Sequence, residues 1–263
     1  IQELEAAYQT RLFDRQGSRI SLTESGNLLL EHCERILEDY KRLEYEMHLL
    51  HNEYTGGLKL GASTTIAQYV LPPLLASFIG KFPQVSLSLL NGNSREIEAA
   101  LQEHRIDLGF VEGVFRLPNI RYTTFLEDEL VAVVRTGSKL AVGEEITPDE
   151  LFHLPLVLRE RGSGTLDVFE RALQQHNIKL SSLQVLMYLG STESIKLFLE
   201  HTDCLGIVSV RSITRELYSG QLRVVEIKGM PMLRDFSFAQ PQGQESGLAQ
   251  VFMQFAMHNN HKL

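Results

Sequence analysis

The sequence predicts an α/β fold preceded by a long helix, and two observations support this. No proline and only one glycine occur between Thr23 and Tyr54, so this stretch is free to form one continuous helix. From Leu58 onward, short apolar runs alternate with amphipathic stretches. Such alternation is typical of repeated strand–helix units, which assemble into mostly parallel sheets with right-handed connections.

The bulk composition excludes several classes of protein. The chain has 263 residues, 43% of them hydrophobic and 22% charged, which fits a soluble globular protein. No apolar run approaches the ~20 residues that span a bilayer, so we expect no membrane partner. The net charge of −8 argues against DNA contact over the whole surface and leaves only a local contact. Cys33 and Cys204 form no CxxC pair, which fits a reducing compartment, and we expect a cytoplasmic protein.

The first 26 residues predict the tail of a helix followed by a β-hairpin. Ile1 and the residues after it form the tail of the helix. The sequence shows neither an initiator Met nor a secretory signal, and we expect it to start within a longer protein. Two short apolar stretches, Leu12–Phe13 and Ile20–Leu22, flank the turn signal Gln16–Gly17–Ser18. Three arginines lie on or beside this hairpin: Arg11, Arg15 and Arg19. By itself the stretch favours a solvated hairpin over a wing that contacts DNA phosphates.

The long helix carries a narrow apolar stripe. Its members are Leu29, Cys33, Ile36, Tyr40, Leu43, Met47, Leu50 and Tyr54. The steps between them alternate four and three, which is a heptad pattern and indicates a dimer-forming helix. A helix packed on its own domain needs a wider apolar face. We expect its start at a Ser21–Glu24 capping box or at Thr23, and its end at Thr55–Gly56–Gly57.

Beyond the helix, the pattern predicts nine strands and seven helical segments. The strands are expected at 58–63, 85–91, 107–113, 129–135, 154–160, 185–190, 205–210, 222–229 and 233–240. The helical segments are expected from 64 to 82 and at 94–106, 147–154, 164–178, 191–202 and 211–220, and a final amphipathic helix at 246–260.

Small polar residues gather where several strands pass into helices. Four such junctions are Gly61–Thr65, Asn91–Ser94, Arg161–Thr165 and Gly190–Thr192. Each one alone is an ordinary cap or turn. Since open α/β sheets bind ligands at the carboxyl ends of their strands, four junctions at one cleft would form a polar pocket for a small molecule, anions included.

Catalytic signatures do not occur in the sequence. The turn Arg161–Thr165 is not a phosphate loop, because no Lys–Ser/Thr pair follows its glycines, and Ser163 does not lie in GxSxG. There are nine histidines but no HExxH. We therefore expect no catalytic residue, no metal and no cofactor, and a protein that is not an enzyme. An α/β enzyme with an unrecognised site is the competing hypothesis.

Several segments, in this order, resemble LysR-type transcriptional regulators. RLFDRQGSRISLTESG followed by a long helix resembles their wing and linker helix, and LKLGASTTIAQYVLPPLLASFIGKFPQVSLSLLNGNSREIEAALQEHRIDLGFVEG resembles the start of their effector-binding domain. RERGSGT, GSTESIKLFLEHTDCLGIVSV and ELYSGQLRVVEIKG resemble its second subdomain. The resemblance implies a DNA-binding regulator that lacks most of its winged helix-turn-helix. The alternative is a periplasmic-type solute-binding receptor.

The resemblance also implies a domain plan. Residues 1–22 would be the remnant of the winged helix-turn-helix and 23–57 the linker and dimerisation helix. Residues 58–133 with 237–263 would form effector subdomain I, and 134–236 effector subdomain II. Two crossover strands near 131–134 and 235–238 would join the subdomains, as in periplasmic binding proteins.

Specific residues follow from the same resemblance. The effector would bind between the subdomains, at Ser63, Thr64 and Thr65 on one side and at Gly162, Ser163, Gly164, Thr165 and Thr192 on the other. Arg11, Arg15 and Arg19 would contact the backbone of double-stranded DNA. Leu29, Ile36, Tyr40, Leu43, Met47 and Leu50 would pair the helices of a homodimer or homotetramer. Many relatives place Arg after GSGT where this chain has Leu166, which argues against a strongly charged effector.

Overall fold

The computed structural model describes residues 1–263 except 17–18, 52–53, 115, 141–142, 243–246 and 260–263. It does not describe the side chains of residues 15, 16, 19, 34, 38, 41, 42, 44–46 and 48–51. The chain divides into two compact units, Ile1–Glu53 and Tyr54–Leu263.

The first unit contains two helices and the predicted hairpin. The elements are α1 (Gln2–Tyr8), β1 (Phe13–Gln16), β2 (Arg19–Leu22) and α2 (Glu24–His51). β1 and β2 pair antiparallel with Phe13 opposite Leu22, which confirms the hairpin. The hydroxyl of Thr23 accepts a hydrogen bond from the backbone N–H of Gly26 at 3.0 Å, so Thr23 caps α2. The Ser21–Glu24 capping box is wrong, because Ser21 lies within β2.

The apolar stripe of α2 is largely exposed in this chain. Exposed fractions are 66% for Ile36, 56% for Tyr40, 55% for Leu43 and 51% for Met47. Leu29 is half-buried, and the side chain of Leu50 lies outside the described residues. Four large apolar side chains exposed in heptad register fit a helix that pairs with another helix.

The expected end of this helix is wrong. The structure ends α2 at His51, and Gly56 already begins strand β3 with φ of +119°. The glycine therefore serves the start of a strand, where this φ excludes most other residues, rather than a helix C-cap.

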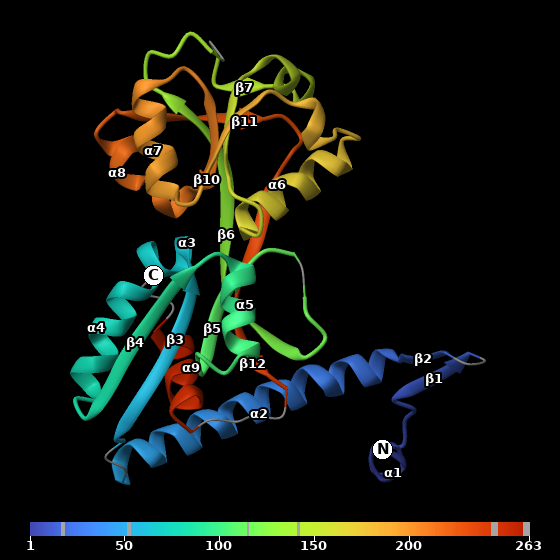
Figure 1. The fold of residues 1–263 in the computed structure, drawn as a ribbon. Helices are drawn as coiled ribbons and strands as arrows, with labels where there is room; N and C mark the ends of the chain where they lie inside the picture. The colour runs from blue at the N-terminus through green and yellow to red at the C-terminus, as the bar shows by residue number, and fades with distance from the viewer. Residues whose placement is uncertain (17–18, 52–53, 115, 141–142, 243–246, 260–263) are drawn as a thin grey trace. The chain divides into compact units, whose positions relative to one another are not determined.

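The second unit consists of two lobes (Figure 1). Lobe I contains β3 (Gly56–Ser63), α3 (Thr64–Tyr69), α4 (Leu71–Lys81), β4 (Val85–Gly92), α5 (Ser94–Gln102), β5 (Leu108–Glu112) and α9 (Gly247–Asn259). Lobe II contains β7 (Glu145–Ile146), η1 (Pro148–His153), β8 (Leu156–Arg159), α6 (Gly164–Gln175), η2 (Leu180–Ser182), β9 (Val185–Leu189), α7 (Thr192–His201), β10 (Leu205–Ser209), η3 (Val210–Ser212), α8 (Thr214–Tyr218) and β11 (Leu222–Ile227).

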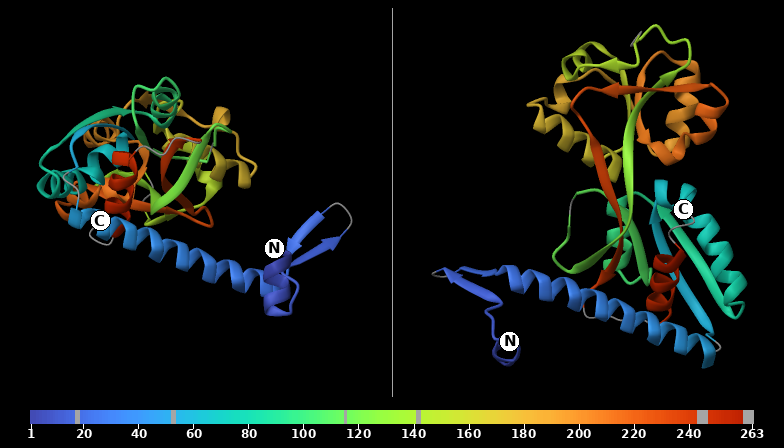
Figure 2. Two further views of the ribbon diagram at one scale, coloured as in Figure 1. Left: turned by 90° about the horizontal axis from the view of Figure 1, so that it is seen from below. Right: turned by 180° about the vertical axis from the view of Figure 1, so that it is seen from behind.

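Two long strands join the lobes. β6 (Ile120–Arg135) and β12 (Met232–Pro241) pair antiparallel from Met232 opposite Leu130 to Pro241 opposite Ile120, with a register shift after Phe236. Both strands run from one lobe into the other in Figure 1 and in the right-hand view of Figure 2. This arrangement places the carboxyl ends of β3 and β8, which belong to different lobes, near the same junction.

The sheet order explains where the expectation of a mostly parallel sheet fails. Neighbouring strands follow the order β4-β3-β5-β12-β6-β10-β8-β9. The pairs β3–β4, β3–β5, β8–β9 and β8–β10 are parallel, as right-handed strand–helix units require. The crossover strands are antiparallel to β5 and β10, because each runs back against the strands of a lobe.

Several expected elements differ in their bounds by a few residues, and three differ more. The strand expected at 129–135 begins at Ile120, because the mixed polar pattern of the preceding residues hides a segment that pairs with β12 throughout. The segment at 147–154 is a 3-10 helix, η1, and the helix expected at 211–220 is reduced to η3 and α8.

Each lobe has its own core. Aromatic rings of α4, β5 and α9 pack together in lobe I, and α6 and α7 pack on the strands of lobe II.

Candidate functional site

The predicted binding residues lie where the two lobes face each other. Ser63 is the last residue of β3, and Thr64 and Thr65 open α3 in lobe I. In lobe II, Ser163 caps α6 by accepting a hydrogen bond from the backbone N–H of Leu166 at 3.2 Å, and Thr192 opens α7. These hydroxyl-bearing side chains are all buried.

A buried arginine links the two sets of hydroxyls. Arg159, the last residue of β8, is 1% exposed. Its guanidinium donates to the Thr64 hydroxyl of lobe I at 3.3 Å and to the Thr192 hydroxyl of lobe II at 3.4 Å. It also donates to the carbonyl oxygen of Gly190 at 3.3 Å. The site therefore contains a cation, Arg159. Leu166, whose place after GSGT argued against a strongly charged effector, packs in the core of lobe II.

The charge of Arg159 is balanced by the next residue in the chain. The Glu160 carboxylate accepts from Nε at 2.8 Å and from Nη2 at 3.0 Å. Adjacent residues in a strand point to opposite faces, so this pairing requires that the strand has ended at Arg159. A bidentate contact of this kind is the strongest form of arginine–carboxylate pair.

A second buried cluster joins the lobes through Glu112 at the end of β5. The Thr65 hydroxyl of lobe I and the Thr165 hydroxyl of lobe II donate to the same oxygen, Oε1, at 3.3 and 3.5 Å. Arg234 of β12 lies 3.2 Å from this oxygen and donates to the Thr165 hydroxyl at 3.0 Å. The other carboxylate oxygen, Oε2, is buried and has no hydrogen-bond partner among the described atoms.

Arg234 of β12 also joins this cluster to Asp128 on the other crossover strand, β6. Its Nε donates to the Asp128 carboxylate of β6 at 2.7 Å, and both side chains are 0% exposed. The other Asp128 oxygen accepts from the Ser209 hydroxyl of β10 at 2.7 Å. The point where the lobes join is thus held by buried ionic contacts, which cost desolvation but fix one geometry.

Two glycines of the RGSGT turn allow the lobes to approach closely. A Cβ atom on Gly164 would lie 2.3 Å from the carbonyl oxygen of Glu112 in lobe I. Gly162 has φ of +94°, and its carbonyl oxygen accepts from the backbone N–H of Arg95 at 3.4 Å. These two predicted residues therefore contact lobe I directly through backbone atoms.

A further contact between the lobes involves Tyr69 of α3 and Glu193 of α7. The Tyr69 hydroxyl donates to the Glu193 carboxylate, which also lies 2.7 Å from the ammonium of Lys196. Burial, together with this hydrogen bond, raises the pKa of Tyr69. Burial alone would raise the pKa of Glu193, but the hydrogen bonds from Lys196 and Tyr69 outweigh it and lower that pKa.

An open pocket of about 320 Å³ lies beside Arg159. Of the predicted residues, Thr64 lines it. Glu160 and Gly190, both partners of Arg159, line it as well. The remaining lining residues are Gln68, Asn91, Gly92, Asn93, Glu96 and Ser191.

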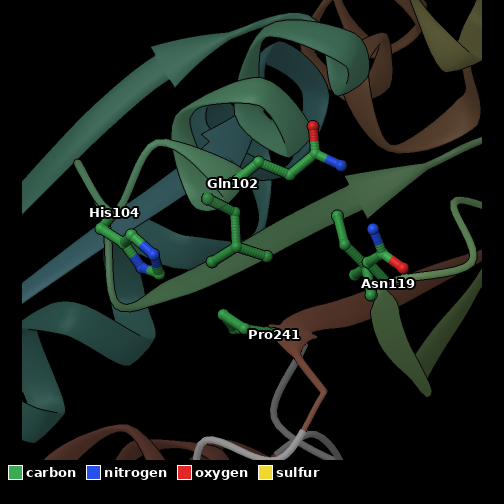
Figure 3. Close-up of a pocket in the computed structure, with 6 residues that line it drawn as sticks. Gln102, His104, Asn119 and Pro241 are labelled. Atoms are coloured by element: carbon green, nitrogen blue, oxygen red, sulfur yellow. The ribbon is translucent and has the colours of Figure 1, made fainter.

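A second pocket of about 260 Å³ lies in lobe I away from these residues (Figure 3). It is lined by Leu101, Gln102, His104, Asn119, Ile120 and Pro241. None of the predicted binding residues lies in it.

The remaining predicted residues are in the first unit. Arg11 is exposed, and its carbonyl oxygen accepts from the Thr23 hydroxyl at 2.7 Å. Arg15 and Arg19 belong to β1 and β2, but their side chains lie outside the described residues. Within the described part of the chain, no cluster of metal-ligating side chains occurs and no helix is long and apolar enough to cross a membrane.

Sequence reasoning missed the charged members of this site. Arg159, Glu160, Glu112, Arg234 and Asp128 are all buried or half-buried. The available signal was the pair Arg159–Glu160, which directly follows three apolar strand residues and precedes the glycine turn. Charges at that position are rarely buried unless they are paired or bind a ligand.

Comparison with known proteins gives consistent matches. The family described as "LysR substrate binding domain" matches residues 51–260. The Escherichia coli protein "Uncharacterized HTH-type transcriptional regulator YeiE" is 34% identical over 227 residues, which cover 86% of this chain and 75% of that protein.

Solved structures also match. The Synechocystis PCC6803 CcmR regulatory domain in complex with 2-PG has a TM-score of 0.70 and 28% identity, and the match covers 78% of this chain and 97% of that one. The effector-binding domain of QuiR in complex with shikimate has a TM-score of 0.70 at 19% identity, with 80% of this chain and 99% of that chain covered. The second of these supports the fold alone.

Proposed function

We propose, from the premise that this chain belongs to the LysR family of transcriptional regulators, that its two lobes sense a small-molecule effector bound at their junction. The family is one of DNA-binding regulators that respond to small molecules. The proposal concerns where this chain holds its effector. The similar CcmR regulatory domain is solved in complex with 2-PG, which supports a small-molecule ligand here.

One observation carries the proposed site: the Arg159 guanidinium bonds hydroxyls from both lobes, Thr64 and Thr192. An effector that replaces any of these contacts changes the interactions between the lobes. A ligand can shift a conformational equilibrium only by its differential affinity for the two states. Groups that touch both lobes provide such differential contacts.

The rest of the predicted plan follows as part of the proposal. Residues 1–22 are the remnant of a winged helix-turn-helix, and α2 (Glu24–His51) is the linker helix. Subdomain I comprises 58–133 and 237–263, and subdomain II comprises 134–236. Arg11, Arg15 and Arg19 contact the DNA backbone, a contact that weakens with salt. Leu29, Ile36, Tyr40, Leu43, Met47 and Leu50 pair two copies of α2.

The proposed function is regulatory and not catalytic, since the relatives that match are transcriptional regulators. The same relatives disfavour a solute-binding receptor for transport, although the lobes would suit one. A regulator that binds DNA works where the chromosome is, and we place this protein in the cytoplasm of a bacterial cell.

A thermal-shift screen of small metabolites on this chain tests the proposal. A ligand at about 100 times its Kd stabilises the folded state by about 2.7 kcal/mol. We expect a hit whose effect is lost in the double variant Thr64→Val/Thr192→Val, which keeps the side-chain shape and removes both hydroxyls. The variant Thr124→Val, at an exposed position of β6, is the control. Hits that stabilise the double variant as strongly as the parent protein would contradict the proposed site.

A further inference from the structure

The pair Arg159–Glu160 is unusual because its two members differ so much in exposure. The Arg159 side chain is 1% exposed and the Glu160 side chain 26%. Arg159 is anchored on several sides, by Thr64, Thr192 and Gly190. Glu160 has its backbone N–H bound to the Leu189 carbonyl oxygen at 3.2 Å. The guanidinium is therefore fixed, whereas the carboxylate can rotate toward solvent.

We propose that the Glu160 carboxylate occupies the position of the effector's own anionic group, and that an effector bearing a carboxylate or phosphate binds by displacing it from Arg159. This inference rests on the proposed function, because it assigns the ligand chemistry of the same site. It makes Glu160 a built-in competitor that sets the affinity and selectivity of the regulator.

The geometry of the contact defines the ligand class. Glu160 engages Nε and Nη2 of Arg159 in parallel, at 2.8 and 3.0 Å. A planar carboxylate or two oxygens of a phosphate reproduce this arrangement, and the Thr64 and Thr192 hydroxyls lie within reach of the same guanidinium. A neutral hydroxyl compound offers no charge to compensate Arg159 once Glu160 leaves. Neutral ligands are therefore poor competitors for this position.

Because carboxylates line the pocket, an anionic ligand can bind Arg159 only by replacing one of them. Two of its lining residues, Glu96 and Glu160, are carboxylates, and none of the described lining side chains is basic. An anion that entered beside Glu160 would meet like charge at short range. Glu96 accepts a hydrogen bond from the backbone N–H of Asn93 at 2.8 Å, and it is not among the hydrogen-bond or ion-pair partners that Arg159 has in the described part of the chain. Glu160 is the carboxylate whose departure exposes a cation.

The turn that begins at Glu160 also takes part in the contact between the lobes. This turn is closed by a hydrogen bond from the Ser163 N–H to the Glu160 carbonyl oxygen at 3.2 Å. The Gly162 carbonyl oxygen in this turn accepts from the Arg95 N–H of lobe I. Glu160 therefore begins a turn of lobe II that is bonded to lobe I.

The test measures the affinity of simple anions for the purified chain. Inorganic phosphate and acetate are titrated separately, with chloride added to keep the ionic strength constant, and the Kd is taken from the rise of Tm with anion concentration. The variants are Glu160→Gln, Glu96→Gln in the same pocket, and Glu226→Gln on β11 as a remote control with the same change of charge. Arg159→Gln removes the cation, and circular dichroism checks its fold.

We expect Glu160→Gln to bind at least one of the two anions about tenfold more tightly than the parent chain, because a competing charge is removed at contact distance. Whichever anion gains identifies a carboxylate or a phosphate as the preferred group. Glu96→Gln removes a like charge that does not bind Arg159, so its gain should be clearly smaller than that of Glu160→Gln. Glu226→Gln, outside the pocket, should leave the Kd unchanged, and a folded Arg159→Gln should bind both anions more weakly than the parent chain.

Two results would overturn the inference: no gain in Glu160→Gln, or an equal gain in Glu96→Gln. These outcomes differ from failure of the proposed function. If a screened metabolite depends on the hydroxyls of Thr64 and Thr192 but is uncharged, or binds Glu160→Gln no better than the parent chain, the site stands and the exchange of anions does not. If no ligand depends on those hydroxyls, the site itself fails.

Discussion

The buried arginine of the crossover strands offers the most direct test of how the lobes are held together. Arg234→Met keeps much of the side-chain volume and removes the charge. It leaves the Asp128 and Glu112 carboxylates, 0% and 1% exposed, without their shared counter-ion. Breaking a buried pair in this way typically costs about 3–5 kcal/mol. Because Arg211 Nε still lies 3.5 Å from an Asp128 oxygen, we expect the lower end, about 3 kcal/mol.

Thermal and urea unfolding measure this loss. The chain has no tryptophan, so far-UV circular dichroism is the suitable signal. For a protein of this size, about 3 kcal/mol corresponds to a fall in Tm of about 6–12 °C. The matched control is Arg105→Met, since Arg105 and its partner Glu103 have side chains 52% and 61% exposed, and such pairs contribute at most about 1 kcal/mol. If Arg234→Met lowers the Tm no more than this control, the reasoning about the buried cluster is refuted.

Three further predictions concern other parts of the chain. Tyr69→Phe should lower the free energy of unfolding by about 1 kcal/mol or less at pH 7, because the hydrogen bond to Glu193 is lost. Since the pKa of Glu193 is lowered in the folded state, this loss should shrink as the pH falls below 4.5, and a loss that does not change with pH would contradict the reasoning. Burial raises the pKa of the Cys204 thiol to about 11, so a thiol reagent at pH 8 should label the more exposed Cys33 first and Cys204 only after unfolding, whereas equal rates would contradict it. Ile36→Asp should shift sedimentation toward monomer by placing a charge in the heptad seam, and an unchanged mass would remove the seam from the interface.

The sequence predicted those parts of the fold that depend on local pattern. The alternation of apolar and amphipathic segments placed nearly every helix and strand, and Thr23 was among the predicted helix starts. The pattern failed where pairing decides the structure. Residues 120–128 form a strand beside β12. Their β-branched and aromatic residues favour a strand, but their mixed order of polar and apolar residues did not reveal one. The same long-range pairing makes the crossover strands antiparallel.

The site was predictable only in its hydroxyls and glycines. Residues such as Thr64 and Thr192 could be found because they follow strands, where caps and ligand contacts both occur. Arg159 and Arg234 could not, because a charged residue in a sequence is read as exposed until its partners are known. Those partners come from other elements: Thr64 is 95 residues from Arg159, and Asp128 is 106 residues from Arg234.

A crystal structure of this chain with a stabilising metabolite tests the central claim most directly. The account predicts that the ligand lies between the lobes, with an oxygen within hydrogen-bond distance of Arg159 and contacts to Thr64 and Thr192. A ligand in the separate pocket of lobe I, beside Gln102, His104 and Asn119 (Figure 3), with the junction of the lobes unchanged, would contradict it.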